Sequence, residues 1–267
     1  MYQWDAVDYH KSSAEQQQWG IELLNKLDLR GTERVLDLGC GDGKIPAEIA
    51  RRVPNGSVVG IDKSEDMIRF ATKHFSQHTF FNLVFEVKDA RDMDFNREFD
   101  VVFSNAALHW VPDHLPVLKR ITKSLKHEGK VIAQMGGKGN ASAILKVLDT
   151  MIDSEKWACY FKGFSVPYTF YEDQGYKVLL ESAGLTVKRI EFIAKQMVHD
   201  GCDGLAAWIR TTWLPYTRRV PENLQSDFIH EIVDTYITTE KLDRSGIIPV
   251  EMVRLEFEAE IAVISDR

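Results

Sequence analysis

Three glycines, Gly39, Gly41 and Gly43, stand within five residues of each other, between the apolar run "VLDL" and a helical pattern. Glycine has no Cβ, so its backbone reaches angles that other residues avoid and lets a ligand approach the main chain closely. A loop of this kind is either a packing device or a binding site. Two acids at the ends of later strand-like runs, Asp62 and Asp89, favour the binding site, because carboxylates accept hydrogen bonds from hydroxyl and amino groups.

The spacing of the glycines distinguishes two classes of ligand. A dinucleotide-binding loop has the pattern G-x-G-x-x-G, and the helix that follows it binds a pyrophosphate at its N-terminus. Here the third glycine comes one residue early, and Asp42 stands inside the loop. An aspartate repels a pyrophosphate but tolerates a positively charged or zwitterionic ligand. The loop therefore favours a nucleoside without phosphates and disfavours a nicotinamide oxidoreductase.

Residues at the following strand ends suit such a nucleoside. Asp62 ends "VVGID", about 20 residues beyond the loop, where a carboxylate accepts from ribose hydroxyls. Asp89, in "FEVKDA", would accept from an adenine amino group, and Met67 and Ile68 would cover the adenine face. An aspartate after a strand is often only a turn or cap residue. Three such features at strand ends in register with the glycine loop together favour a nucleoside-binding site over turn residues alone.

The elements that must position these residues alternate between strands and helices in the first half of the chain. Near-continuous apolar strands separated by helices indicate a parallel sheet that is buried on both faces. Right-handed crossovers then place ligands at the carboxyl ends of the strands. The predicted strands are 35–38, 58–61, 83–87, 100–105 and 130–135, and the predicted helices are about 44–53, 65–76 and 114–126.

The second half is predicted to add helices and two more strands to the same domain. Residues 186–194 and 253–264 alternate, the latter as a half-exposed antiparallel strand. The fold class is α/β: a Rossmann-like, doubly wound, mostly parallel seven-stranded sheet with an antiparallel last strand and a helical cap insertion. The predicted parts are an N-terminal helical lid (1–32), a cofactor-binding core (33–140), a helical continuation of the core (141–185), C-terminal strands of the same sheet (186–194 and 253–265) and a helical cap (195–252).

Composition excludes several classes of function. The net charge of -7 and the absence of a Lys/Arg cluster argue against a nucleic-acid partner. No apolar run approaches the ~20 residues that span a bilayer, and the N-terminus lacks the apolar core of a signal peptide. We expect a cytoplasmic monomer or homodimer that binds neither membrane nor metal. The three widely spaced cysteines fit neither a disulfide framework nor a zinc site: Cys40, Cys159 and Cys202.

Five segments in order resemble the motifs of class I S-adenosylmethionine-dependent methyltransferases: "VLDLGCGDGK", "VVGIDKSEDMI", "VKDARDM", "FDVVFSNAALHWVPD" and "LKHEGKVIAQM". The resemblance covers residues 33–136. It implies methyl transfer from S-adenosylmethionine, with S-adenosylhomocysteine as product. It also implies that the methionine part lies among Asp37, Gly39, Cys40 and Gly41, the ribose and adenine at Asp62, Lys63 and Met67, the adenine edge at Asp89 and Ala90, and the methionine carbons beside Asn105.

The flanking segments "WDAVDYHKSSAEQQQWGIELL" and "LAAWIRTTWLPYTRRVP" resemble the lid and cap of trans-aconitate and juvenile-hormone-acid methyltransferases, which esterify small organic acids. A carboxylate is already ionised at neutral pH, so it needs no general base. Catalysis would then rest on alignment and desolvation. An arginine suits a carboxylate clamp, and Arg210 is the first candidate and Arg218 the second. Tyr9 and Gln16 would contact the acceptor from the lid.

Two alternatives remain open from the sequence. A hydroxyl, amine or carbon acceptor would need a base, and His109 could serve because the pKa of histidine lies near neutrality. Otherwise His109 is a hydrogen-bonded wall residue, and Trp110 is either a packing aromatic or a platform for the acceptor. A non-catalytic protein that binds S-adenosylmethionine as a sensor would have the same sequence through residue 136.

Overall fold

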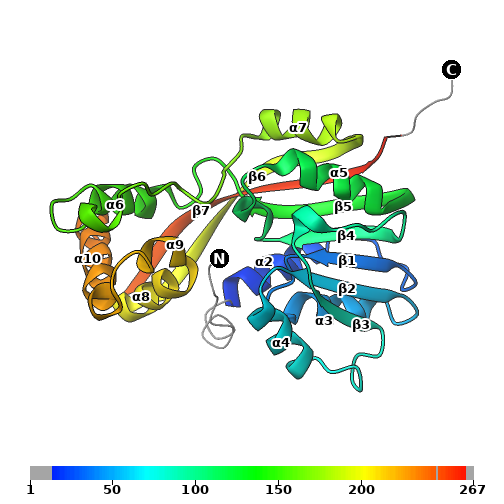
Figure 1. The fold of residues 1–267 in the computed structure, drawn as a ribbon, viewed down its shortest axis with the longest axis horizontal. Coiled ribbons are helices and arrows are strands. Elements are labelled where there is room, and N and C mark those ends of the chain that lie inside the picture. The colour runs from blue at the N-terminus through cyan, green and yellow to red at the C-terminus, as the bar shows by residue number, and fades with distance from the viewer. Residues whose placement is uncertain (1–13, 245, 263–267) are drawn as a thin grey trace. The chain divides into compact units, whose positions relative to one another are not determined.

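The computed structural model describes residues 14–244 and 246–262. Its strands form one seven-stranded sheet in the order β3-β2-β1-β4-β5-β7-β6 (Figure 1). Strands β1 to β5 pair in parallel, and β7 is antiparallel to β5. The predicted fold class is therefore confirmed. The strands are β1 (Arg34–Leu38), β2 (Ser57–Asp62), β3 (Leu83–Val87), β4 (Phe99–Asn105), β5 (Leu125–Gly136), β6 (Leu185–Asp200) and β7 (Ile247–Ile261).

The three helices predicted at about 44–53, 65–76 and 114–126 are present as α3, α4 and α5, and the predicted helical cap contains α8, α9 and α10. Among the described residues, no helix is both long and apolar enough to cross a membrane. The α-helices are α2 (Ala14–Leu24), α3 (Lys44–Arg52), α4 (Glu65–His74), α5 (His114–Ser124), α6 (Ser142–Ile152), α7 (Asp173–Ser182), α8 (Gly201–Thr212), α9 (Leu214–Thr217) and α10 (Glu222–Glu240). The short 3-10 helices are η1 (Ala90–Asp92), η2 (Leu108–Trp110) and η3 (Ala158–Tyr160).

Two hydrophobic layers hold the parallel sheet between its helices. On β1, Val35 packs in the layer that contains Leu23 of α2 and Ile49 of α3. The next residue, Leu36, points to the opposite face, in the layer that contains Leu118 of α5. Successive side chains of a strand alternate between faces, so a strand that is apolar at every position must be covered on both. This packing brings the carboxyl ends of β1, β2 and β4 to one edge of the sheet.

The described chain divides into two compact units. One contains 139–167 and 194–253, and the other contains the remaining described residues, with β1 to β5. The predicted continuation of the core at 141–185 is thus divided, because 141–167 belong with the predicted cap. The physical reason is the apolar face of α6, where Ile144 and Leu148 are fully buried and the helix packs against α10.

Aromatic side chains form the interior of that smaller unit. Trp157 packs edge-on against Phe228, with ring centroids 5.0 Å apart. Trp208 and Trp213 make a second edge-on pair, at 5.6 Å. Edge-to-face geometry of this kind is typical of a buried aromatic core. All four side chains are buried, so this cluster is a core rather than an exposed surface.

Candidate cofactor site

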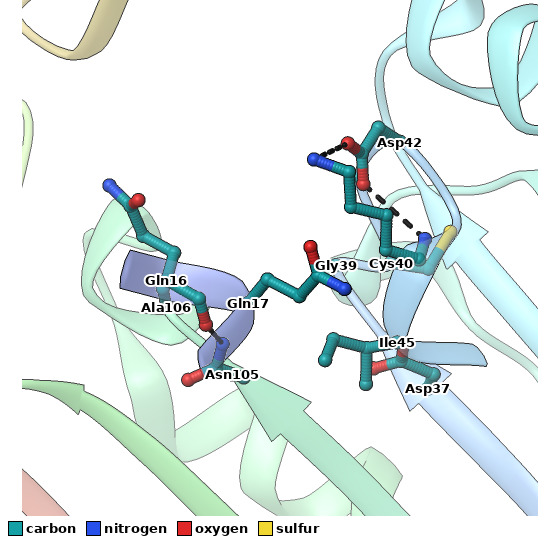
Figure 2. Close-up of a pocket in the computed structure, with 11 residues that line it drawn as sticks. Gln16, Gln17, Asp37, Gly39, Cys40, Asp42, Ile45, Asn105 and Ala106 are labelled. Carbon is teal, nitrogen blue, oxygen red and sulfur yellow. Dashed lines mark hydrogen bonds and ion pairs between the residues drawn. The ribbon is translucent and has the colours of Figure 1, made fainter. Parts of the chain in front are cut away.

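A pocket opens at the carboxyl ends of β1 and β4, between the glycine loop and α2 (Figure 2). It contains about 420 Å³ of space, open solvent included, which suits a small molecule. Six residues predicted from the sequence line it: Gln16, Asp37, Gly39, Cys40, Gly41 and Asn105. Five more that were not among the predicted site residues line it as well: Gln17, Asp42, Lys44, Ile45 and Ala106.

The glycine loop turns sharply as β1 ends. The backbone N–H groups of Gly39 and Cys40 both donate to the carbonyl of Ile61, at 2.8 and 3.0 Å. Gly39 has a φ of +77°, which L side chains rarely adopt, and a Cβ there would lie 2.1 Å from the Cβ of Ala107. Only glycine fits at this position. The loop therefore lies close against the segment that follows β4.

Asp62 ties this loop to the end of β2. Its Oδ2 accepts from the backbone N–H of Gly41 at 3.1 Å, and its Oδ1 accepts from that of Ser64 at 2.8 Å. An ionised carboxylate offers about four lone-pair sites, so acceptor capacity is left for a hydroxyl of a ligand. Lys63 is exposed beside it, and Met67 is buried in α4. The predicted contacts of these residues with ribose and adenine stay predictions.

Asp37 gives the pocket its electrostatic character. The carboxyl is buried, and burial together with the nearby charge of Asp62 raises its pKa to about 8. A second acid of the pocket, Asp42, pairs with Lys44, whose Nζ lies 3.2 Å from Oδ2 (Figure 2). A buried acid of this kind gains most from a positively charged ligand. The ammonium and sulfonium groups of S-adenosylmethionine meet that requirement, so the residues present fit the cofactor.

This pKa predicts a pH dependence of cofactor binding. Below pH 8 the free protein holds a proton on Asp37, and a cationic ligand favours the ionised form, so binding releases that proton. We expect affinity for S-adenosylmethionine to rise between pH 6 and 7.5, and to rise less in Asp37→Asn. Calorimetric titration in buffers of different ionisation enthalpy measures the released proton. An equal pH slope in Asp37→Asn would contradict the assignment.

The same pKa has a consequence for the free protein. Between about pH 4 and pH 8 the folded state binds a proton at Asp37 that the unfolded chain has lost. The contribution of this group to the free energy of unfolding therefore decreases as the pH rises through that window. The Asp37→Asn variant lacks this decrease. Urea unfolding curves of both proteins between pH 4 and pH 8 therefore test whether the free energy of unfolding of the wild type falls relative to that of the variant.

Two amide side chains on the α2 side of the pocket carry acceptors that a ligand can use. Asn105 donates through Nδ2 to the backbone carbonyl of Gln16 at 2.9 Å, which ties α2 to the end of β4. The Oδ1 of Asn105 and the Oε1 of Gln16 are buried and have no hydrogen-bond partner within the described residues. Buried polar atoms normally find a partner. Gln17 extends its side chain from α2 towards the glycine loop (Figure 2).

Just beyond the end of β3, Asp89 is paired with a neighbouring arginine. Asp89 accepts from Nη2 and Nε of Arg91, at 2.7 and 3.0 Å. This pairing holds the pKa of the Asp89 carboxyl below its ordinary value, despite partial burial. Ala90 begins η1 and packs against the core. The predicted place of both residues at the adenine edge stays a prediction, and Arg91 is a neighbour that sequence reasoning missed.

The environment of His109 differs from that of a base with an ordinary pKa. It is buried, and the backbone N–H of Gly136 donates to its Nδ1 at 3.4 Å. Burial, followed by the charges of Arg254 and His114, lowers its pKa well below the ordinary value. The imidazole is therefore neutral, with its proton on Nε2. Its neighbour Trp110 packs edge-on against a tyrosine, and the described lining of the pocket includes neither residue.

The remaining predicted acceptor contacts stay predictions. Arg210 is exposed on α8 and Arg218 is exposed at the end of α9, both in the smaller unit. Tyr9 lies outside the described residues. No group of metal-ligating side chains that could hold a metal ion occurs in the part of the chain that the structure describes.

Comparison with known proteins shows the family of this chain. The family model of a methyltransferase domain matches residues 29–183. The chain is 32% identical to trans-aconitate 2-methyltransferase of Mycolicibacterium gilvum over 219 residues, which cover 79% of this chain and 81% of the relative. It is 28% identical to juvenile hormone acid O-methyltransferase of Bombyx mori over 274 residues, which cover 97% and 95%.

A solved structure shares the fold. The phosphoethanolamine N-methyltransferase 2 of Haemonchus contortus, solved with phosphomonomethylethanolamine and S-adenosylhomocysteine, superposes with a TM-score of 0.60. The identity is 18%, and the match covers 96% of this chain and 57% of the other. The matched domain begins just before the glycine loop and includes the five motif segments within residues 33–136. The chain therefore belongs to the methyltransferase domain family. It is an S-adenosylmethionine-dependent methyltransferase, as its ordered motifs predict.

Proposed function

We propose that this protein transfers a methyl group from S-adenosylmethionine to the carboxylate of a small organic acid. The observation that carries the proposal is similarity along most of the chain to two methyltransferases whose names specify acids, trans-aconitate and juvenile hormone acid. A carboxylate oxygen forms the new bond to the methyl carbon, the carbon–sulfur bond breaks, and the sulfur keeps the electron pair. No proton moves in this step, so the product pair is a methyl ester and S-adenosylhomocysteine.

The residues of the site would bind and orient rather than react. When bound, the cofactor supplies a methyl group on a positively charged sulfur. Asp37 and the glycine loop would hold its cationic part, and Asp62 would accept from its ribose. Gln16 and Gln17 of α2 line the pocket, and Gln17, which extends towards the glycine loop, would help to exclude water from it (Figure 2). Alignment and desolvation of an anionic nucleophile are then the sources of rate enhancement.

The state of His109 supports an acceptor that needs no base. Its Nδ1 accepts from the N–H of Gly136, and its low pKa makes it a poor proton acceptor at neutral pH. A hydroxyl or amine acceptor would require proton removal, whereas a carboxylate requires none. The alternative with His109 as general base is therefore less favoured than carboxyl methylation.

The test is product formation on a panel of acids that includes trans-aconitate, juvenile hormone acid and straight-chain monocarboxylic acids. Mass spectrometry should detect a methyl ester that alkali hydrolyses, together with S-adenosylhomocysteine. The His109→Asn variant keeps an acceptor for the Gly136 N–H, and we expect its kcat to remain within about tenfold of the wild type. Loss of a general base instead costs about 10²- to 10⁴-fold.

Each other outcome identifies an alternative. A base-stable product, together with a large loss of kcat in His109→Asn, would indicate a hydroxyl-, amine- or carbon-directed enzyme. Binding of S-adenosylmethionine with no product on any acceptor would indicate a sensor. A methyl ester in the wild type supports the proposal if its rate of formation, measured at saturating S-adenosylmethionine, is independent of pH above the pKa of the acid.

A further inference from the structure

The side chain of Gln17 enters the cofactor pocket from α2. Gln17 lines the pocket, and Figure 2 shows its amide extended across the space towards Gly39, whereas the neighbouring Gln16 points away from the glycine loop. No hydrogen bond of the Gln17 amide occurs in the part of the chain that the structure describes. The oxygen that accepts and the nitrogen that donates are therefore both available to a ligand.

The backbone from which Gln17 projects is held against the sheet. The carbonyl of Gln16 accepts from Nδ2 of Asn105, at the end of β4, at 2.9 Å. One turn further along α2, a Cβ on Gly20 would lie 2.7 Å from Cδ1 of Ile45 and 2.9 Å from Nδ2 of Asn105. The helix thus approaches α3 and β4 as closely as a glycine allows. A side chain on a helix that is held in this way needs little rearrangement to bind a ligand.

The chemistry of a primary amide suits the charges of this pocket. The pocket contains the buried Asp37 and the pair of Asp42 with Lys44, at 3.2 Å. The amino-acid end of S-adenosylmethionine is a zwitterion, in which an ammonium donates hydrogen bonds and a carboxylate accepts them. An added acid or base would attract one of these groups and repel the other. A neutral amide combines an acceptor with two donors, so it can bind both groups.

We propose that Gln17 binds the amino-acid end of the cofactor, with Oε1 accepting from the ammonium and Nε2 donating to the carboxylate. This inference rests on the proposed function only through the cofactor, since it names a residue with which that same site recognises S-adenosylmethionine. The contact joins the cofactor directly to α2, so cofactor binding stabilises this helix against local opening. Sequence analysis gave a ligand contact on this helix to Gln16 and none to Gln17.

The experiment compares the wild type with Gln17→Met and Gln18→Met. Gln18 is a matched control, because it is the next residue of α2 and is exposed. Calorimetry measures the binding of S-adenosylhomocysteine and of 5′-methylthioadenosine, which has the same nucleoside and a thioether but no amino-acid end. We expect Gln17→Met to weaken S-adenosylhomocysteine by about 10- to 100-fold, the range for hydrogen bonds to charged groups. Its affinity for 5′-methylthioadenosine should stay within about threefold of the wild type.

The control and the ligand pair define what would overturn the inference. Gln18→Met should bind both ligands like the wild type. Wild-type affinity of Gln17→Met for S-adenosylhomocysteine overturns the inference. An equal loss of affinity for both ligands does so as well, because it marks a general effect on α2 rather than a contact with the amino-acid end.

A charge change tests the two halves of the contact. Gln17→Glu keeps an acceptor for the ammonium but repels the carboxylate, so it should bind S-adenosylmethionine more weakly than the wild type does. Decarboxylated S-adenosylmethionine has the ammonium and the sulfonium without the carboxylate, and Gln17→Glu should bind it at least as tightly as the wild type. A loss of equal size for these two ligands contradicts the proposed contact.

Hydrogen exchange of the α2 amides (Ala14–Leu24) gives a readout of the helix itself. At saturation, S-adenosylhomocysteine should protect these amides more than 5′-methylthioadenosine does in the wild type and in Gln18→Met, but not in Gln17→Met. Equal protection by the two ligands in the wild type overturns the inference. None of these readouts needs a methyl acceptor, so failure to esterify any acid overturns the proposed acceptor class and not this inference. A wild type that does not bind S-adenosylhomocysteine overturns both.

Discussion

Replacing Asp62 by alanine is expected to lower the affinity for S-adenosylmethionine by about 100-fold or more. The carboxylate accepts from the N–H groups of Gly41 and Ser64, and it would also accept from the ribose of the cofactor. Hydrogen bonds to a charged group contribute about 1.5–3 kcal/mol each, and 1.4 kcal/mol is a tenfold change in affinity. Alanine removes the ribose contact and also releases the glycine loop from β2. Calorimetric titration measures the loss directly.

Two further variants distinguish binding from general destabilisation. Asp62→Asn keeps one acceptor oxygen and should lose less affinity than Asp62→Ala. Asp66→Asn removes a charge from the nearby α4, where Asp66 pairs with the exposed Arg69, and it should bind the cofactor like the wild type. Wild-type affinity in Asp62→Ala would contradict both the assignment of this site and the role of the glycine loop in binding.

The second large effect is expected for Gly39→Ala. A methyl group there would lie 2.1 Å from the Cβ of Ala107, and a φ of +77° is strained for alanine. The left-handed conformation alone costs about 1–2 kcal/mol. The overlap adds to this cost because both segments are tied into the sheet. We expect lower thermal stability, weak or absent cofactor binding and little activity.

Substitutions at two other glycines separate the cost of backbone strain from the cost of the steric overlap. Gly163 also has a positive φ, +68°, but a Cβ there would meet nothing within 4 Å, so Gly163→Ala reports the backbone strain alone. Gly175 lies in α7 with open space and no positive φ, and alanine should leave stability unchanged or raise it by up to about 1 kcal/mol. Thermal melts of the three variants therefore rank as Gly39→Ala, Gly163→Ala and Gly175→Ala, from least to most stable. Equal melting temperatures for Gly39→Ala and Gly163→Ala would contradict the predicted overlap.

The sequence predicted the parallel part of the fold because its signals are local. Apolar runs such as 35–38 and 58–61 match β1 and β2 closely, and Gly184 follows the end of α7 with a φ of +87°. Parallel strands end at one edge of a sheet, so the order of motifs along the chain was enough to bring Asp37, Gly41 and Asn105 into one pocket.

Packing between distant segments decided what local patterns could not. The place of α6 depends on contact with α10, so no pattern within 141–185 indicates where the core unit ends. Gln17 lines the pocket because α2 lies across the end of β4, a contact that Asn105 makes with the helix backbone. The pKa of His109 departs from its ordinary value because tertiary packing buries the ring and brings Arg254, which is distant in the sequence, near it.

By itself the sequence determined the doubly wound sheet, the glycine loop with Asp62, and the family. These depend on backbone conformation and on alternation within short segments. The tertiary structure alone decided the environment of β7, which the sequence predicted to be a half-exposed strand. Glu258 and Glu260 are partly exposed, whereas Arg254 and Glu256 are buried by α2, β5 and β6. Charged side chains on an alternating strand predict a solvated face, and only the packing of α2 turns that face into an interior polar row.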